Sequence, residues 1–360
     1  MKKSERFHQF SQDFRDPYDR DRDRVIHSEW FRNLEYKTQV FINSDGDYFR
    51  TRLTHSLEVS QIARTMAKYL GLSESLAEVI ALSHDIGHTP FGHVGGDTLD
   101  ESLKKAGNQN GFEHNFQSFR VLTALEKRYT NFDGLNLTFA TLEGVLKHST
   151  PYKKPFLPKW IDDTFALDFH PSIEAIIVDH ADTIAYSAAD IDDAIKYRLI
   201  DFDDLMESSI LKNAIEEVRK HENIDTSNEL FRYRLTTKLL TIMITDFLEN
   251  SKSAVAKCTN EKIPASQDTE IGFSKEIGLQ IKELSRIMYK KIYRHEFIVK
   301  KMFFGKQCIA NLFDALSSET SLLPAKYRDM LERKNKNRVA ADFISSLSDR
   351  AAVQLYRELY

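Results

Sequence analysis

Residues 81–93, with the sequence ALSHDIGHTPFGH, combine three imidazoles with one carboxylate and are the stretch best equipped for chemistry. Adjacent side chains on a helix point about 100° apart, so His84 and Asp85 do not share a helix face. They can still converge on one ion where a helix ends and the chain turns, as Gly87 and Pro90 indicate here. A divalent transition metal suits such a mixture of nitrogen and oxygen ligands. The stretch therefore predicts part of a metal site whose remaining ligands come from other helices.

Two other segments offer the remaining ligands. His55 lies in the first turn of a predicted helix, and Asp182 lies in a long, partly acidic helix. Together with His84 and Asp85 they supply two neutral imidazoles and two carboxylates, which balance a dication and leave positions open for water and substrate. A metal held in this way lowers the pKa of bound water and polarises a phosphoryl oxygen, so the predicted chemistry is hydrolysis.

Each of these ligands also has an ordinary structural interpretation. His55 alone is more typical of a helix cap or a half-buried core group, an HD dipeptide is common, and Asp182 alone is compatible with a solvated face. However, Asp182, Tyr186 and Asp190 recur every four residues and form one stripe of a helix whose flanking residues are apolar. A polar stripe on such a helix lines a site more often than it faces bulk water.

The elements that must position these residues are helical. Strand-like alternation is nearly absent, so the sequence predicts an all-α fold. Residues 1–205 are expected to form the core, with residues 206–360 as a helical portion packed on it and not independent. The predicted helices are 25–41, 54–70, 75–86, 97–106, 113–129, 137–148, 172–200, 208–222, 227–251, 275–294, 296–316 and 337–358.

Local signals refine these helices. Gly71 should end the helix that begins near Thr54, whose Leu57 is expected to face inward, and Ser73 should cap the next helix. Pro171 is expected in the first turn of the long helix. The charged run at 1–24 predicts a solvated surface arm, residues 43–50 a short hairpin, and residues 150–160 a loop.

Composition excludes several classes of protein. The formal net charge is −4 and charged residues make up 29%, so there is no global basic field of the kind that marks a nucleic-acid-binding protein. Cys258 and Cys308 lie in no CxxC or CxxH pattern, which argues against a disulfide framework and is typical of a reducing cytoplasm. No apolar run follows the two lysines at residues 2–3, so a signal peptide is not expected. No apolar run elsewhere approaches the ~18 residues of a membrane span.

Five blocks in order carry a resemblance to a known family: KTQVF, TRLTHSLEV, HDIGHTPFGH, GFEHNFQS and ADTIAY. The set His55, His84-Asp85 and Asp182 resembles the metal motif of the HD superfamily of phosphohydrolases. The surrounding blocks resemble its dGTPase-like branch, the deoxynucleoside triphosphate (dNTP) triphosphohydrolases. The resemblance spans about Arg15 to Asp193. It implies an HD-domain core and hydrolysis of dGTP or several dNTPs to a deoxynucleoside and tripolyphosphate, with Mn²⁺, Mg²⁺ or Fe²⁺ bound.

The resemblance also implies roles for the substrate-binding residues. Arg52 falls where the family has an α-phosphate-binding arginine, and a guanidinium can hold two phosphate oxygens there. Gln39 matches a glutamine that contacts the sugar or base. Tyr186 and Asp190 match residues beside the deoxyribose, where Tyr186 would crowd a 2′-hydroxyl and Asp190 would accept from the 3′-hydroxyl. A surface salt bridge for Arg52 and a solvated helix position for Gln39 are the structural alternatives.

Proton transfer falls to histidines by the same resemblance. His93 matches the family's acid/base histidine, which a glutamate three residues later often orients; here that position is Gly96. Two alternatives follow, because an orienting carboxylate controls the tautomer and basicity of an imidazole. Either Asp97 takes over this role, or His88 and His114 carry more of the proton transfer. For His114 a structural position at a helix start is the competing interpretation.

Two other functions remain open at this point. One is another HD phosphohydrolase, such as a nucleotidase, a cyclic-nucleotide phosphodiesterase or an alarmone hydrolase. The other is a dNTP-binding sensor without turnover, which Gly96 favours. The family implies a homo-oligomer, hexameric or tetrameric, with regulation by a second dNTP or single-stranded DNA and no membrane partner. The basic run at 15–24 and the aromatic-basic stretch at 288–304 suit a subunit interface, a phosphate site or plain surface.

Overall fold

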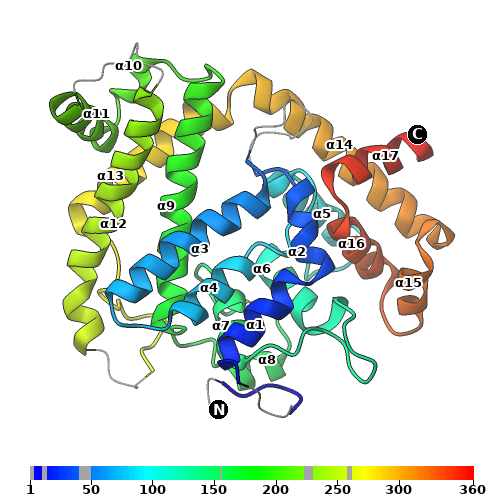
Figure 1. Ribbon diagram of the computed structural model, residues 1–360. Coiled ribbons are helices and arrows are strands. Elements are labelled where there is room, and N and C mark those ends of the chain that lie inside the picture. Colours follow the sequence, from blue (N-terminus) through cyan, green and yellow to red (C-terminus); the bar gives the residue numbers. More distant parts are fainter. Residues whose placement is uncertain (1–3, 10–13, 40–49, 155, 223–229, 258–261) are drawn as a thin grey trace.

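The computed structural model describes residues 4–9, 14–39, 50–154, 156–222, 230–257 and 262–360 (Figure 1). Over these residues the regular structure is helical, and strand-like pairing is confined to isolated bridges. The all-α prediction is therefore confirmed. Short 3₁₀ and π segments are labelled η. The elements are α1 (Pro17–Ile26), α2 (Glu29–Asn33), η1 (Leu34–Tyr36), α3 (Arg52–Tyr69), α4 (Glu74–Ser83), α5 (Gly92–Lys105), α6 (His114–Arg120), η3 (Val121–Leu125), α7 (Phe139–Leu146), α8 (Lys159–Phe165), α9 (Ile173–Lys196), α10 (Phe202–Leu205), α11 (Ser209–Glu222), α12 (Phe231–Lys257), α13 (Lys275–Met288), η4 (Tyr289–Tyr293), α14 (Glu296–Ser318), η5 (Thr320–Leu322), α15 (Ala325–Arg328), η6 (Asp329–Glu332), α16 (Lys336–Ser346) and α17 (Asp349–Leu359).

Three helices, α3, α4 and α9, pack together at the centre of the molecule (Figure 1). Helix α3 begins with a capping box in which Thr51 and Thr54 satisfy each other's backbone amides. Gly71, at φ +71°, follows its end, and Ser73 accepts from the amide of Leu76 to cap α4. These two signals are confirmed. The second half of α4, from Val79 to Ser83, is buried, so the end of this helix delivers His84 into the interior.

The C-terminal portion shares its cores with the N-terminal one. The main core includes Val25 and Ile298, so it crosses the predicted boundary at residue 205. A second core joins Phe91, Leu99 and other residues around α5 to α14, α16 and α17. Helix α12 packs along α9, and α14 packs along α5 (Figure 1). Helices α5 and α9, which carry or follow the sequence motifs, are therefore in contact with the C-terminal helices.

The N-terminal charged run is not a solvated arm. Asp16 accepts from the amide of Tyr18 and Pro17 occupies the first turn, so residues 17–26 form α1. Asp21 is fully buried, where it accepts from the backbone and hydroxyl of Thr138 and pairs with Arg6. The prediction failed because it counted charges and ignored the start signal of the helix.

Several boundaries also differ from the predicted ones. The helix expected at 25–41 is broken at Ser28, which caps α2, and the one at 337–358 is broken where Ser348 caps α17. Pro171 precedes the N-cap Ser172 instead of lying in the first turn, and α8 interrupts the predicted loop at 150–160. Leu57 is 52% exposed and does not face inward.

Two further predictions meet the limits of the described chain. Most of the hairpin expected at 43–50 lies outside the described residues. Among the described helices, none combines the length and apolar character needed to cross a membrane.

Candidate metal centre and active site

Three predicted metal ligands meet where α3, α4 and α9 converge. His55, His84 and Asp182 each place one ligand atom within 4.8 Å of the others. His55 Nε2 lies 2.8 Å from Asp182 Oδ1, and His84 Nε2 lies 3.9 Å from the same oxygen. Two nitrogens and a carboxylate oxygen at this spacing can hold one divalent ion. The structure thus brings together side chains that are 127 residues apart in the sequence.

The hydrogen bonding of His84 prepares this imidazole for a metal. Its Nδ1 donates to the carbonyl of Ala81 at 2.6 Å, which fixes the proton on Nδ1. The lone pair is then on Nε2, a buried atom without a hydrogen-bond partner. Burial also lowers the pKa of His84, so the imidazole is neutral at pH 7. Leaving a buried acceptor such as Nε2 unpaired costs free energy, and a bound metal would satisfy this nitrogen.

Asp85 borders this group and connects it to the next part of the site. Its Oδ1 lies 3.4 Å from His84 Nε2 and 3.2 Å from His88 Nε2, and its Oδ2 accepts from Arg52 Nη1 at 2.6 Å. Burial opposes ionisation, but the neighbouring His84 and Arg52 hold the pKa of Asp85 well below its usual range. Asp85 lies outside the tight group of three atoms, so its role as fourth ligand stays a prediction.

His148 and Asp179 complete the surroundings of Asp182, and sequence reasoning missed both. His148 follows α7; its Nδ1 lies 2.5 Å from Asp179 Oδ1 and its Nε2 lies 3.6 Å from Asp182 Oδ2. Burial lowers the pKa of His148, but the two carboxylates outweigh it and raise that pKa well above the usual range. The cation holds Asp182 in place. Asp179 is three residues before Asp182 on α9, a spacing that would have revealed it.

The three acid/base candidates form one cluster beside Asp85. The rings of His88 and His114 stack with centroids 4.1 Å apart, and His93 lies 5.3 Å from His88 and 5.9 Å from His114. Burial lowers the pKa of all three imidazoles, that of His114 to about 4. His93 is the most exposed of them and faces a cavity. At neutral pH all three are therefore proton acceptors.

The replacement at Gly96 leaves His93 without a hydrogen-bonded carboxylate among the described residues. Asp97 lines the same cavity and raises the pKa of His93, but burial and Arg52 lower it more. A Cβ atom at Gly96 would meet Thr89 Oγ1 at 3.8 Å and Phe112 at 3.9 Å, so a side chain would fit. Beside His114, Glu113 places Oε1 3.9 Å from the imidazole Nδ1.

Arg52, the predicted α-phosphate ligand, is 1% exposed, and its guanidinium is only partly paired. Nη1 binds Asp85, while Nε and Nη2 are buried atoms without hydrogen-bond partners. Gly92, at φ +60°, passes so close that a Cβ there would lie 3.2 Å from Nη2. Two unsatisfied donors on a buried cation define a place for an anion.

One cavity of about 890 Å³ is lined by most of these groups, but not by His84, Asp179 or Glu113: Arg52, His55, Asp85, His88, His93, Asp97, His114, His148 and Asp182. Tyr186 and Asp190 continue along its wall from α9, as predicted, and Gln39 is there with a buried, unpaired Oε1. Tyr293 of η4 donates to Asp190 Oδ2, and burial raises the pKa of Asp190 to about 7. The aromatic-basic stretch at 288–304 supplies much of the opposite wall, including Tyr289, Tyr293, Arg294 and Phe303.

The metal centre predicts a stability change that needs no substrate. Mn²⁺ at about one hundred times its dissociation constant should stabilise the folded protein by about 2.7 kcal/mol in a thermal melt. His84→Ala should abolish this shift and the metal found by elemental analysis, because it removes the prepared Nε2. His221→Ala is the control, since that imidazole is exposed and pairs with Glu217. Metal retained by His84→Ala at the wild-type level would place the ion elsewhere.

The lowered pKa of His114 predicts how the free energy of unfolding depends on pH. Its pKa is about 4 in the folded chain, below the ordinary 6.5. Between these values the unfolded chain binds the proton and the folded chain does not, so His114 makes the protein less stable as pH falls from 6.5 to 4. His114→Asn should therefore reduce the wild-type loss of unfolding free energy between pH 7 and pH 5 by on the order of 1–2 kcal/mol. Urea melts with a chelator present measure this difference; equal losses would contradict the prediction.

Comparison with known proteins agrees with this geometry. The HD domain family model matches residues 52–187, which contain all of the candidate metal ligands, and the phosphohydrolase-associated domain matches residues 271–358. A deoxyguanosinetriphosphate triphosphohydrolase-like protein of Wolinella succinogenes is 55% identical over 364 residues, covering 100% of both chains. Proteins of the same description from Brucella suis and Leptospira interrogans are 40% and 37% identical, covering 96% of this chain and 90% of theirs. The chain therefore belongs to the HD-domain family of deoxyguanosinetriphosphate triphosphohydrolase-like proteins.

Proposed function

We propose that this protein hydrolyses dNTPs to a deoxynucleoside and tripolyphosphate in a metal-dependent reaction. The observation that carries the proposal is the buried guanidinium of Arg52, which presents two unpaired nitrogens next to the predicted metal ligands. An anionic substrate that satisfies those donors lies within reach of both Asp85 and the histidine cluster. Names of the related proteins refer to dGTP, which supports a purine dNTP as one substrate.

The cavity is suited to a nucleoside triphosphate in size and charge. Its volume of about 890 Å³ is at the upper end of the ~300–1,000 Å³ of small-molecule sites. Arg52, Arg294 and Lys306 lie along it and offset phosphate charge. Arg52 is the cation beside the metal ligands, so we assign it to the α-phosphate and the other two to the outer phosphates.

The reaction breaks the bond between the α-phosphorus and O5′ and forms a bond from that phosphorus to a water oxygen. When bound, a divalent ion at His55, His84, Asp85 and Asp182 supplies Lewis-acid polarisation and a more acidic water. Arg52 stabilises charge that develops on the α-phosphate oxygens. His93 is neutral and reaches the cavity, so it can accept the proton of the water and deliver it to O5′. His88 and His114 pack against it and hold its ring.

Residues of α9 beyond Asp182, together with Gln39, provide the contacts for the sugar. Asp190 already accepts from a hydroxyl, that of Tyr293, and a deoxyribose 3′-hydroxyl can take a similar place. Tyr186 lies one helical turn before Asp190 and half-buried against the core, so a 2′-hydroxyl beside it would meet a rigid ring. Gln39 offers an unpaired Oε1 from the other side. These contacts favour a deoxynucleotide over a ribonucleotide.

Product analysis tests the proposed bond cleavage. Protein incubated with Mn²⁺ and dGTP should release deoxyguanosine and tripolyphosphate, which anion-exchange chromatography separates. In H₂¹⁸O the label should appear in tripolyphosphate, because water attacks phosphorus. Formation of dGMP and pyrophosphate would contradict the scission, and hydrolysis of a nucleoside monophosphate or cyclic nucleotide instead would indicate another HD phosphohydrolase. Binding of dGTP in a thermal melt without any product would indicate a sensor.

Replacement of Arg52 tests the phosphate contact. Arg52→Lys should lower kcat/KM by about 10²–10³-fold, because a lysine cannot satisfy Asp85 and two phosphate oxygens in the fork geometry. Bound metal should stay at the wild-type level. Arg64→Lys is the matched control, since Arg64 is half-exposed on the same helix and pairs with Glu74 and Glu78. If Arg52→Lys has the wild-type kcat/KM, Arg52 does not contact the reacting phosphate.

A further inference from the structure

A carboxylate from the C-terminal helix α17 contacts two active-site segments that come from separate parts of the sequence. One segment is residues 37–39, which ends in Gln39. The other is the turn at residues 88–92, which carries His88 and leads to His93. Neither the sequence motifs nor the resemblance includes Asp349, the first residue of α17.

Asp349 accepts hydrogen bonds from two backbone amides and one hydroxyl. Thr38 donates its amide to Asp349 Oδ2 at 3.0 Å, and its hydroxyl donates to the same oxygen. Phe91 donates its amide to Oδ1 at 3.0 Å. Each oxygen therefore holds a different segment, and the carboxylate is 6% exposed. An aspartate in the first turn of α17 is also favoured by the helix dipole.

The two segments held in this way converge on Arg52. The amide of Arg52 donates to the carbonyl of Lys37 at 3.1 Å, and Thr38 forms a β-bridge with Thr51. A Cβ at Gly92 would lie 3.2 Å from Arg52 Nη2 and 3.5 Å from the carbonyl oxygen of Gln39. A displacement of either segment by a fraction of an ångström would therefore change the phosphate, sugar and proton-transfer contacts together.

The backbone at Phe91 needs such a restraint. Phe91 adopts φ +60°, a conformation that costs a residue with a Cβ free energy and persists only where contacts enforce it. Its ring packs so closely on α14 that a Cβ at Gly305 would lie 2.7 Å from it. The side chain is thus fixed by α14, and the amide is fixed by Asp349.

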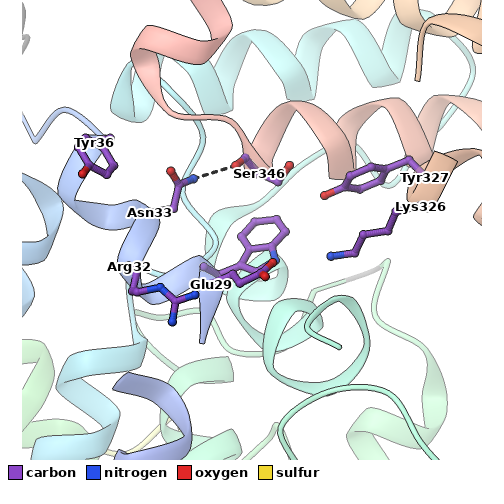
Figure 2. A pocket seen from close by; sticks show the side chains of 8 residues that line it. Glu29, Arg32, Asn33, Tyr36, Lys326, Tyr327 and Ser346 are labelled. Carbon is purple, nitrogen blue, oxygen red and sulfur yellow. Dashed lines mark hydrogen bonds between the residues drawn. The ribbon is translucent and has the colours of Figure 1, made fainter. Parts of the chain in front are cut away.

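Further hydrogen bonds near Asp349 connect residues 33–37 to the turn at His88 and to α16. Lys37 is fully buried and donates Nζ to the carbonyls of His88 at 2.6 Å and Ser345 at 2.8 Å. Asn33 Nδ2 donates to the carbonyl of Ser346 at 2.8 Å, and Figure 2 shows this bond at the edge of a second pocket between α2 and α16. Hydrogen bonds from Asn33, Lys37 and Thr38 therefore attach this part of the chain to the C-terminal helices α16 and α17.

We propose that Asp349 is a positioning residue of the active site, which sets the relative placement of Gln39, Arg52 and His93. The proposal rests on the proposed function for its kinetic consequences. Asp349 acts through the backbone of Thr38 and Phe91 and does not line the cavity among the described residues. The C-terminal portion thereby contributes to the geometry of the reaction as well as to the walls of the cavity.

The test compares Asp349→Asn with Ser348→Ala, using the full chain. Asparagine keeps the shape but retains one acceptor oxygen, so one of the two segments loses its partner. We expect kcat/KM for dGTP to fall by about tenfold to a hundredfold with a clear rise in KM, and bound Mn²⁺ to stay unchanged. Partial unfolding alone would lower kcat per total protein and leave KM as it was. Ser348→Ala removes the cap of the same helix and destabilises it, but it touches neither segment, so its KM should match the wild type.

Hydrogen exchange supplies a readout without substrate. In Asp349→Asn, peptides that contain the amides of Thr38 or Phe91 should exchange faster than in the wild type, whereas those from α12 should not change. A KM rise as large in Ser348→Ala, or wild-type KM and exchange in Asp349→Asn, would overturn the proposal. If the wild type has no dNTPase activity, the proposed function fails, and the exchange comparison alone decides whether Asp349 holds the two segments.

Discussion

The buried pair of Arg52 and Asp85 is the interaction on which the rest of the site depends. Moving both charges out of water is unfavourable, and loss of one partner from such a pair costs about 3–5 kcal/mol. The pair is only 2.6 Å long, yet it leaves two nitrogens of the guanidinium unsatisfied. The protein tolerates this because α3 and α4 are anchored by a large apolar core. An incompletely paired cation in such a place is more typical of a binding site than of a structural salt bridge.

The surroundings of this pair explain the states of the other groups. Burial, and after it the charge of Arg52, lowers the pKa of His88 and His93, so the imidazoles next to Arg52 are neutral. The opposite holds on the other side of the metal ligands, where carboxylates raise the pKa of His148. The histidines near Arg52 are thus neutral, whereas His148 is a cation that pairs with Asp182. The difference follows from which charged residues face each histidine, because burial lowers the pKa of each imidazole and the carboxylates beside His148 outweigh that effect.

The C-terminal helices are part of this arrangement. Tyr293 reaches Asp190, and residues of η4 and α14 form the wall opposite the metal ligands. Asp349 joins two loops that the N-terminal sequence blocks place near Arg52. The match of a phosphohydrolase-associated domain to residues 271–358 agrees with this shared construction. The site is therefore built by both portions of the chain.

The sequence by itself determined the helical class, the cap of α4 at Ser73 and the choice of His55, His84 and Asp182 as candidate metal ligands. These follow from periodicity, capping and metal-ligand chemistry, which act over a few residues or require particular residue types. Only the tertiary structure decided that these three side chains meet, that Asp21 is buried and that His148 pairs with Asp182. The same holds for the hydrogen bond from Tyr293 to Asp190 and for the contacts of Asp349 with Thr38 and Phe91. A carboxylate or a phenol carries no local mark of the partner it meets a hundred residues away, because its environment is created by the packing of distant helices.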